Sequence, residues 1–385
     1  MNAKIPDLLE MMRQLVAIPS VSSVNPKFDQ GNIGVVNLLA EWLKGLGFET
    51  EVMSVGGRKD KANLIATLGS GENGLVLSGH TDTVPYDKTS WSQDPFTLTE
   101  KAGLLYGLGT SDMKGFLAMI VEAASQIKAN ELREPLIILA TADEESDMSG
   151  AKELVKQARP KARYALIGEP TENIPVRLHK GITMEGVKII GKSGHSSNPE
   201  YGNSALEGMY RVMTVIRQWR DELQSNNRNE DFKVPVPTLN LGYIQGGDNP
   251  NRICADCELH FDLRPLPGMD LNELRQSIHQ EIIAELADTG LEIEFKSLFP
   301  GIPAMETPAE SELVIASEEL AGNPAVAVNF ATEGPFLNQL GMETVIMGPG
   351  EISQAHKPDE YLSLDRVKES QRVLSGLIRR FCINP

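Results

Sequence analysis

Short apolar segments recur along the first half of the chain, each followed by a polar turn. They occupy residues 75–79, 136–140 and 164–168, with little polar alternation inside them. Runs of this length are typical of strands that are buried on both faces of a parallel sheet. The segments Phe116 to Ile127 and Ser149 to Gln157 have the composition and spacing of helices. Because strands and helices alternate, we predict a three-layer α/β domain with a mostly parallel sheet.

The hydrophobic pattern changes after His179-Lys180-Gly181. Apolar and polar residues then alternate in segments that predict strands, at Thr183–Ile190, Pro237–Ile244 and Ile253–Leu263. Two longer segments, near residues 204–223 and 271–286, have helical periodicity. One-sided strands with two helices on the other face predict a two-layer α+β sandwich.

A chain of 385 residues exceeds the size at which one hydrophobic core keeps growing, so two domains are expected. The strand predicted at residues 344–350 must return to the first sheet after the sandwich. We therefore predict that residues 1–180 and 298–385 form one discontinuous domain. Residues 181–297 form the α+β domain that is inserted into it.

Side chains that bind metals stand at the ends of the apolar segments. His80 follows the first, Glu145 the second and Glu169 the third, while Asp112 precedes the predicted helix and His356 follows the strand at 344–350. The carboxyl ends of parallel strands meet at one sheet edge, where ligands bind in open α/β sheets. Two imidazoles and three carboxylates suit zinc, cobalt or manganese. If one carboxylate bridges, five ligands can hold two ions about 3.5–4 Å apart.

Asp82 lies two residues after His80 and has two interpretations. Its carboxylate could orient the imidazole through the second ring nitrogen, because metal-bound histidines usually have such an outer partner. Alternatively, it is a turn residue before Val84-Pro85. Its position beside a candidate ligand favours the first interpretation.

Composition narrows the classes of partner. The net charge of −17 argues against nucleic-acid and anionic-membrane partners and is compatible with a cationic small-molecule substrate. No stretch approaches 18 apolar residues, so we expect no transmembrane helix. The start of the chain, Met-Asn-Ala-Lys-Ile-Pro, lacks the apolar core of a signal peptide, and we therefore expect a cytoplasmic protein.

The cysteines do not predict a disulfide framework, because there are only three of them. Cys254 and Cys257 have a redox spacing but fall within the strand predicted at 253–263. Alternation along a strand would place the two sulfur atoms on opposite faces, which favours a structural role. His260, between two acids, is interpreted as a surface residue of the same strand rather than a ligand.

Five motifs resemble those of the dinuclear-metal aminoacylase and peptidase family, and the resemblance extends over essentially the whole chain. They are Ser78-Gly-His-Thr-Asp-Thr-Val-Pro85, Gly109-Thr-Ser-Asp-Met-Lys-Gly115, Asp143-Glu-Glu145, Gly168-Glu-Pro170 and His356-Lys-Pro-Asp-Glu360. The resemblance implies a catalytic domain with two divalent ions, zinc before cobalt or manganese. It also implies an inserted lid and dimerisation domain, and hence a homodimer.

The same resemblance implies roles for individual residues. Asp112 would bridge the ions, with His80 and Glu169 on one and Glu145 and His356 on the other. Glu144 would be the general base, and Asp82 would orient His80 from outside the ligand shell.

Residues of the inserted domain and one later loop complete the predicted site. His195 would reach a partner subunit's site and stabilise the oxyanion, although a lone histidine in a polar loop is usually a surface residue. Arg252, beside Asn251, would bind the substrate carboxylate through its guanidinium fork, the alternative being a surface arginine. Glu333 could pair with a cationic group of the substrate, a hypothesis that rests on charge alone.

Further segments resemble the branch of the family that hydrolyses N-acetyl-L-ornithine to L-ornithine and acetate, in arginine biosynthesis. Among them are Arg177-Leu-His-Lys-Gly181, Gly194-His-Ser-Ser197, Asn251-Arg-Ile-Cys254 and Thr332-Glu333, which is followed by Gly334 where alanine is expected. The alternatives are a desuccinylase, a broad N-acetyl amino acid deacylase or a dipeptidase. A remote alternative is an inactive binding protein, which predicts loss of a ligand or of the base. The five ligands and Glu144 are all present.

Overall fold

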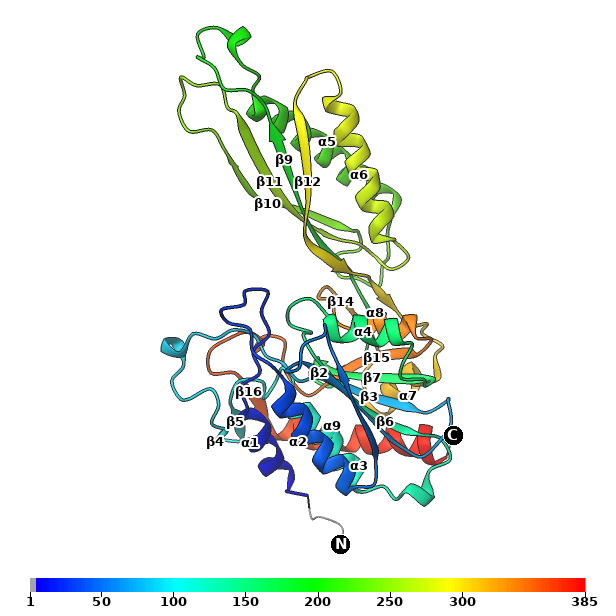
Figure 1. Cartoon of the computed structure of the whole chain (residues 1–385). Coiled ribbons are helices and arrows are strands. Elements are labelled where there is room, and N and C mark those ends of the chain that lie inside the picture. The colour runs from blue at the N-terminus through cyan, green and yellow to red at the C-terminus, as the bar shows by residue number, and fades with distance from the viewer. Residues whose placement is uncertain (1–4, 385) are drawn as a thin grey trace. The chain divides into compact units, whose positions relative to one another are not determined.

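The computed structural model describes residues 5–384, and the chain divides into two compact units (Figure 1). The first unit comprises the chain through Arg177, Thr307–Val326, and the chain from Thr332 onward. The second unit comprises Leu178–Glu306 and Ala327–Ala331. The chain therefore leaves the first unit and returns to it.

A nine-stranded mixed sheet organises the first unit, and its strands β8, β13 and β14 include residues at which the chain passes between the two units. Its order is β1 (Glu49–Ser54), β2 (Ala62–Leu68), β6 (Leu136–Thr141), β3 (Leu75–His80), β7 (Tyr164–Pro170), β15 (Glu343–Gly348), β8 (Val176–His179) and β13 (Met305–Glu306), with β14 (Val326–Val328) beside β8. The central strands β6, β3, β7 and β15 are parallel, whereas the flanking pairs are antiparallel. A small antiparallel sheet contains β16 (Tyr361–Ser363), β5 (Leu104–Tyr106) and β4 (Thr99–Lys101). The predicted α/β class is confirmed.

Helices cover both faces of this sheet and form the outer two of its three layers. One face carries α1 (Leu8–Val16), α2 (Ile33–Gly45), α3 (Lys114–Ser125) and α9 (Leu364–Ile378), and the other carries α4 (Ser149–Gln157) and α8 (Gly334–Gln339) (Figure 1). Helix α7 (Glu312–Ala321) packs beside α9 and β15. Single turns of helix occur at Lys88–Ser90, Ala129–Glu131, Pro199–Tyr201 and Arg379–Ile383. No helix among residues 5–384 is long and apolar enough to cross a membrane.

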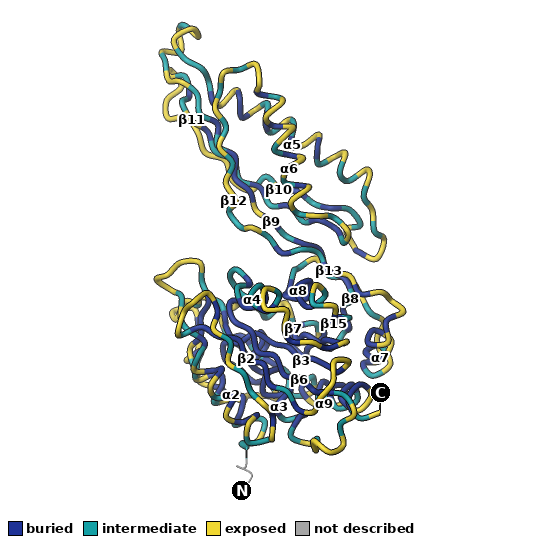
Figure 2. Tube along the Cα trace, turned by 45° about the vertical axis from the view of Figure 1, so that its right-hand side comes forward, coloured by how far each residue is buried: buried dark blue, intermediate teal, exposed yellow. Residues whose placement is uncertain are grey.

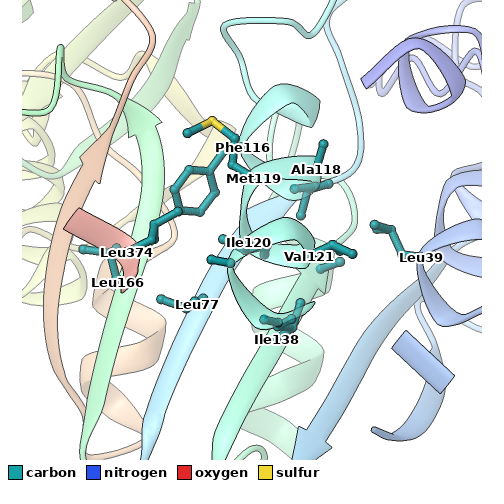
Figure 3. Packing of buried hydrophobic residues seen from close by; sticks show 14 of the residues in the cluster. Leu39, Leu77, Phe116, Ala118, Met119, Ile120, Val121, Ile138, Leu166 and Leu374 are labelled. Carbon is teal, nitrogen blue, oxygen red and sulfur yellow. The ribbon is translucent and has the colours of Figure 1, made fainter. Parts of the chain in front are cut away.

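The core of the first unit lies where α3 packs on the parallel strands. Strands β3, β6 and β7 are buried along their whole length, as Figure 2 shows. Phe116 and Ile120 of α3 lie among Leu77, Ile138 and Leu166 of the strands (Figure 3). Burial on both faces explains why these strands are continuous apolar runs in the sequence.

Gly168 allows α3 to approach β7 closely. A Cβ atom at this position would lie 2.1 Å from the ring of Phe116, which is closer than any side chain tolerates. The residue after it is Glu169, so the close approach of helix and strand lies next to this carboxylate.

The second unit is an antiparallel sheet with two helices on one face, as its alternating pattern predicts (Figure 1). The strand order is β10 (Thr238–Gly246), β11 (Asp256–Arg264), β9 (Ile182–Ile190) and β12 (Glu292–Ile302). Helices α5 (Ala205–Asn226) and α6 (Leu271–Leu286) share a core with the sheet, which includes Val187, Ile216, Phe261 and Ile278. The predicted two-layer α+β architecture is confirmed.

The prediction that Cys254 and Cys257 lie on opposite faces of one strand is wrong. Strand β11 begins only at Asp256, and its burial alternates regularly from that residue onward. Cys254 precedes the strand, where alternation does not apply, and both sulfur-bearing side chains are buried in the core of the second unit. His260 does lie on the half-buried polar face of β11, with Nε2 2.8 Å from Glu258.

His179, at the end of β8, makes the stability of the protein sensitive to acid. Its side chain is fully buried, and Nδ1 donates to the carbonyl of Lys180 at 2.8 Å. Burial lowers the pKa of His179 to about 4 from 6.5. The unfolded chain therefore binds a proton between these values that the folded chain does not, so the stability falls as the pH falls through this window.

We predict that His179→Asn, which keeps an N–H donor but cannot titrate, removes part of this acid sensitivity. The free energy of unfolding of the wild type, relative to the variant, should fall by about 3 kcal/mol between pH 7 and pH 4. Urea denaturation at both pH values measures the difference. A difference that does not change with pH would contradict the assignment.

Candidate metal centre

The five predicted ligands all lie at one edge of the first unit's sheet. His80 is the last residue of β3, and Glu169 is the penultimate residue of β7. Glu145 follows β6, Asp112 lies two residues before α3, and His356 lies in the loop after β15. Because β6, β3, β7 and β15 are parallel neighbours, their carboxyl ends bring these segments together.

The shortest distances group the five side chains into two sets that share Asp112, and Glu145 also lies within 4.8 Å of a ligand atom of His80. In one set, His80 Nε2 lies 3.0 Å from Asp112 Oδ1 and 3.9 Å from Glu169 Oε1. In the other, His356 Nε2 lies 3.7 Å from Asp112 Oδ2 and 3.0 Å from Glu145 Oε2. The two oxygens of one carboxylate thus face different histidines, which is the geometry that a bridging ligand requires.

Glu144 lies beside the first set. One of its carboxylate oxygens lies within 4.8 Å of ligand atoms of both His80 and Glu169. Burial and the neighbouring carboxylate of Glu169 raise the pKa of Glu144 well above its usual value. Glu144 is therefore grouped with Glu169, and Glu145 with Asp112 and His356, while both acids lie near His80.

The electrostatics of the cluster favour bound cations. Burial and the carboxylate of Asp112 raise the pKa of Glu169, and its Oε1 has no hydrogen-bond partner among the described residues. Burial opposes the charged form of His80, but the surrounding carboxylates outweigh it and raise its pKa. A hydrogen bond to Glu145 raises the pKa of His356 to about 9. Buried acids that repel one another and imidazoles that face them form a donor set that fits two divalent ions.

Asp82 contacts His80, but not in the predicted way. Its backbone carbonyl oxygen lies 3.0 Å from His80 Nδ1, whereas its carboxylate oxygen Oδ1 lies 3.8 Å away. The other carboxylate oxygen accepts the backbone N–H of Glu145 at 3.0 Å. The main chain of Asp82 is therefore the nearer partner of the imidazole, and its side chain fixes the segment that carries Glu145.

Asp143, the first acid of the Asp143-Glu144-Glu145 motif, has a partner of its own. Its carboxylate binds the buried ammonium group of Lys61 and accepts a hydrogen bond from Ser22 at 2.7 Å. Lys61 also binds Asp29 at 2.7 Å. Of the three acids in this motif, Glu144 and Glu145 are then left to face the candidate metal site. No sequence pattern identified Lys61, because it follows a charged turn and has the local context of a surface residue.

Glu333 lies at the start of α8 and is 1% exposed. Its Oε1 accepts a hydrogen bond from Ser78 at 2.5 Å, two residues before His80 on β3. Burial raises the pKa of Glu333, while the hydroxyl groups of Ser78 and Thr141 oppose that rise. The carboxylate thus belongs to the same edge of the sheet as the ligands.

The other predicted residues lie in the second unit and are gathered there. His195 and Arg252 form an isolated antiparallel bridge, and the N–H of Ser196 donates to the carbonyl of Asn251 at 3.1 Å. The backbone N–H of Ser197 donates to His195 Nδ1 at 3.1 Å. Because Nδ1 is the acceptor, the neutral imidazole carries its proton on Nε2. Arg252 is half-exposed and binds Asp248 at 2.6 Å.

The carboxyl edge of this mixed α/β sheet holds two donor sets around one shared carboxylate. This combination of fold and site is that of a candidate dinuclear metalloenzyme. The sequence matches Peptidase family M20/M25/M40 over residues 76–380, and the chain belongs to this family.

The chain is similar to curated relatives and to solved structures over nearly its full length. The chain is 46% identical over 383 residues to an acetylornithine deacetylase of Proteus mirabilis, covering 100% of this chain and 99% of that one. It is 47% identical over 379 residues to an acetylornithine deacetylase of Pasteurella multocida, covering 98% and 99%. The structure resembles a tripeptidase from Staphylococcus aureus, with a TM-score of 0.73 at 21% identity and 97% coverage of both chains. It also resembles a dinuclear metal binding peptidase from Bacillus subtilis, with a TM-score of 0.66 at 16% identity and 97% coverage of both.

We predict that Lys61→Met destabilises the first unit, because it leaves the buried carboxylate of Asp143 without its cation. Removing one partner of a buried ion pair costs about 3–5 kcal/mol. Urea denaturation measures the loss. Lys161→Met is the control, since its ammonium group is exposed and pairs with the exposed Glu72; it should cost less than about 1 kcal/mol. Equal effects of the two substitutions would contradict the role of Lys61.

Proposed function

We propose that this protein hydrolyses N-acetyl-L-ornithine to acetate and L-ornithine, a step of arginine biosynthesis, with two divalent metal ions. The observation that carries the proposal is Asp112, whose two oxygens face His80 and His356 separately. Identity of 46–47% over the full chain to two proteins named acetylornithine deacetylase supports the choice of substrate. A cytoplasmic location stays a prediction from the sequence.

The ligand assignment follows the two donor sets. His80, Asp112 and Glu169 would hold one ion, and Asp112, Glu145 and His356 the other. Oxygen and imidazole ligands favour zinc, with cobalt or manganese as alternatives. When bound, such ions lower the pKa of water and polarise a carbonyl group.

Glu144 would carry the proton transfers. Its carboxylate reaches the neighbourhood of His80 and Glu169 without being required as a ligand of either set. It can therefore take a proton from the attacking water and return it to the nitrogen of the leaving ornithine as the amide C–N bond breaks. Asp82 would keep Glu145 and the His80 ring in place during this exchange.

The second unit would supply the groups that hold the substrate. His195, with its proton on Nε2, can donate a hydrogen bond to the carbonyl oxygen as negative charge develops on it. In the proposed homodimer this histidine belongs to the site of the other subunit. Arg252 is exposed enough to exchange Asp248 for the substrate carboxylate, and Asn251 stands beside it. Glu333 would pair with an ammonium group of the substrate.

Acetate and succinate release across a panel of substrates tests this function. Metal-stripped protein is reconstituted with zinc or cobalt and assayed with N-acetyl-L-ornithine, N-acetyl-L-methionine, N-succinyl-diaminopimelate and a dipeptide. We expect the highest kcat/KM for N-acetyl-L-ornithine and no turnover without metal. Preference for the succinylated substrate or the dipeptide would replace the proposal by one of those activities.

The control for the panel is Glu144→Gln. This variant should still bind two ions but lose hydrolysis of every substrate, because it lacks the proton acceptor. Activity that persists in the variant would come from a contaminating enzyme or from another base.

We predict that Glu333→Gln raises KM for N-acetyl-L-ornithine far more than for N-acetyl-L-methionine, because only ornithine has a cationic side chain. Loss of one charge-assisted pair corresponds to roughly a tenfold change or more. Steady-state kinetics with both substrates provide the comparison. Equal changes would instead assign Glu333 a structural role through its hydrogen bond to Ser78.

A further inference from the structure

Glu360 is a buried carboxylate that the proposed chemistry does not use. It lies immediately before β16 and is 1% exposed. Its Oε1 accepts the backbone N–H groups of Ser111 at 2.7 Å and Asp112 at 3.0 Å, and its Oε2 accepts that of Gly109 at 2.9 Å. One side chain therefore binds three amides of the turn that carries the shared ligand Asp112.

This turn needs an anchor from outside. Its residues Thr110, Ser111 and Asp112 are buried, so unpaired amide groups here would be costly. The main chain of Glu360 also takes part, because its carbonyl oxygen accepts a hydrogen bond from the N–H of Gly107 at 3.0 Å. Four hydrogen bonds thus join residue 360 to the segment 107–112.

The same residue ends the loop that carries His356. A second contact couples this loop to the turn at its other end, where the N–H of Glu351 donates to Ser111 Oγ at 3.2 Å. The two segments lie so close that a Cβ atom on Gly350 would meet Ser111 Oγ at 2.4 Å. The loop that carries His356 is therefore held against the turn that carries Asp112 at both of its ends.

We propose that Glu360 is a positioning residue that sets the spacing between Asp112 and His356, and so the affinity of the second donor set for its metal ion. This inference rests on the proposed dinuclear centre. His356 is the ligand that most needs such support, because 57% of its side chain is exposed and it comes from a loop. Outer-shell residues of this kind change metal affinity by about 10–100-fold.

A purely structural role is the alternative, in which Glu360 only satisfies buried amides. That role predicts a less stable protein with unchanged ligand geometry once folded. Metal affinity separates the two roles, because stability alone does not alter the affinity of the folded protein for each ion.

The test compares Co²⁺ binding to the metal-stripped wild type and to metal-stripped Glu360→Gln. Titration calorimetry and the visible absorption of the bound ion measure the binding. Gln keeps one acceptor oxygen but turns an NH₂ group toward an amide donor. We expect two ions in the wild type, and in the variant a loss of about 10–100-fold in affinity for one of them. Two ions bound with wild-type affinities by the folded variant would overturn the proposal.

The matched control is Glu185→Gln, which removes another buried carboxylate, one that binds Arg275 at 2.7 Å in the second unit. This variant should be less stable than the wild type and should keep its affinity for each metal ion within about twofold. A loss of metal affinity as large as that of Glu360→Gln would indicate a general effect of destabilisation and would overturn the proposal.

A second variant covers the case in which Glu360→Gln does not fold. Ser111→Ala removes only the contact with the loop at Glu351, and it should weaken the same ion by a smaller factor. Unchanged affinity in this variant would then overturn the proposal. A wild type that binds no Co²⁺ or Zn²⁺ would remove the proposed metal centre itself, a result distinct from the failure of Glu360 alone.

Discussion

Repulsion among buried carboxylates is the constraint on which the rest of this structure depends. Asp112, Glu144, Glu145 and Glu169 meet at one edge of the sheet with two imidazoles. Burial and repulsion from neighbouring carboxylates raise the pKa of Glu144 and Glu169, so the side chains hold these positions against an electrostatic cost. Cations between them would convert that repulsion into attraction. The surrounding fold, from the parallel strands to the buried lysine beneath Asp143, keeps the acids in place.

Much of this arrangement can be predicted from the sequence, because the carboxyl ends of parallel strands lie at the same edge of the sheet. The apolar runs that end at His80 and before Glu169 are β3 and β7, and their carboxyl ends lie at one edge. Helix α4 and helix α6 begin and end where their periodicity predicts. Likewise, regular alternation identified β9 and most of β11.

The remaining features depend on contacts that leave no local pattern. The position of Lys61 beneath Asp143 and the clamp of Glu360 on Asp112 join residues far apart in the chain. Asp82 was expected to reach His80 through its carboxylate, but the backbone direction at the end of β3 brings its carbonyl closer. Periodicity gave no strand boundary before Asp256, so Cys254 was assigned to the wrong environment.

Anomalous diffraction at the zinc absorption edge, from crystals of the protein grown with Zn²⁺, tests the central claim most directly. The account predicts two peaks that share Asp112 as a ligand. One would lie among His80, Asp112 and Glu169, and the other among Asp112, Glu145 and His356. Ions bound elsewhere, with these five side chains left without metal, would contradict it.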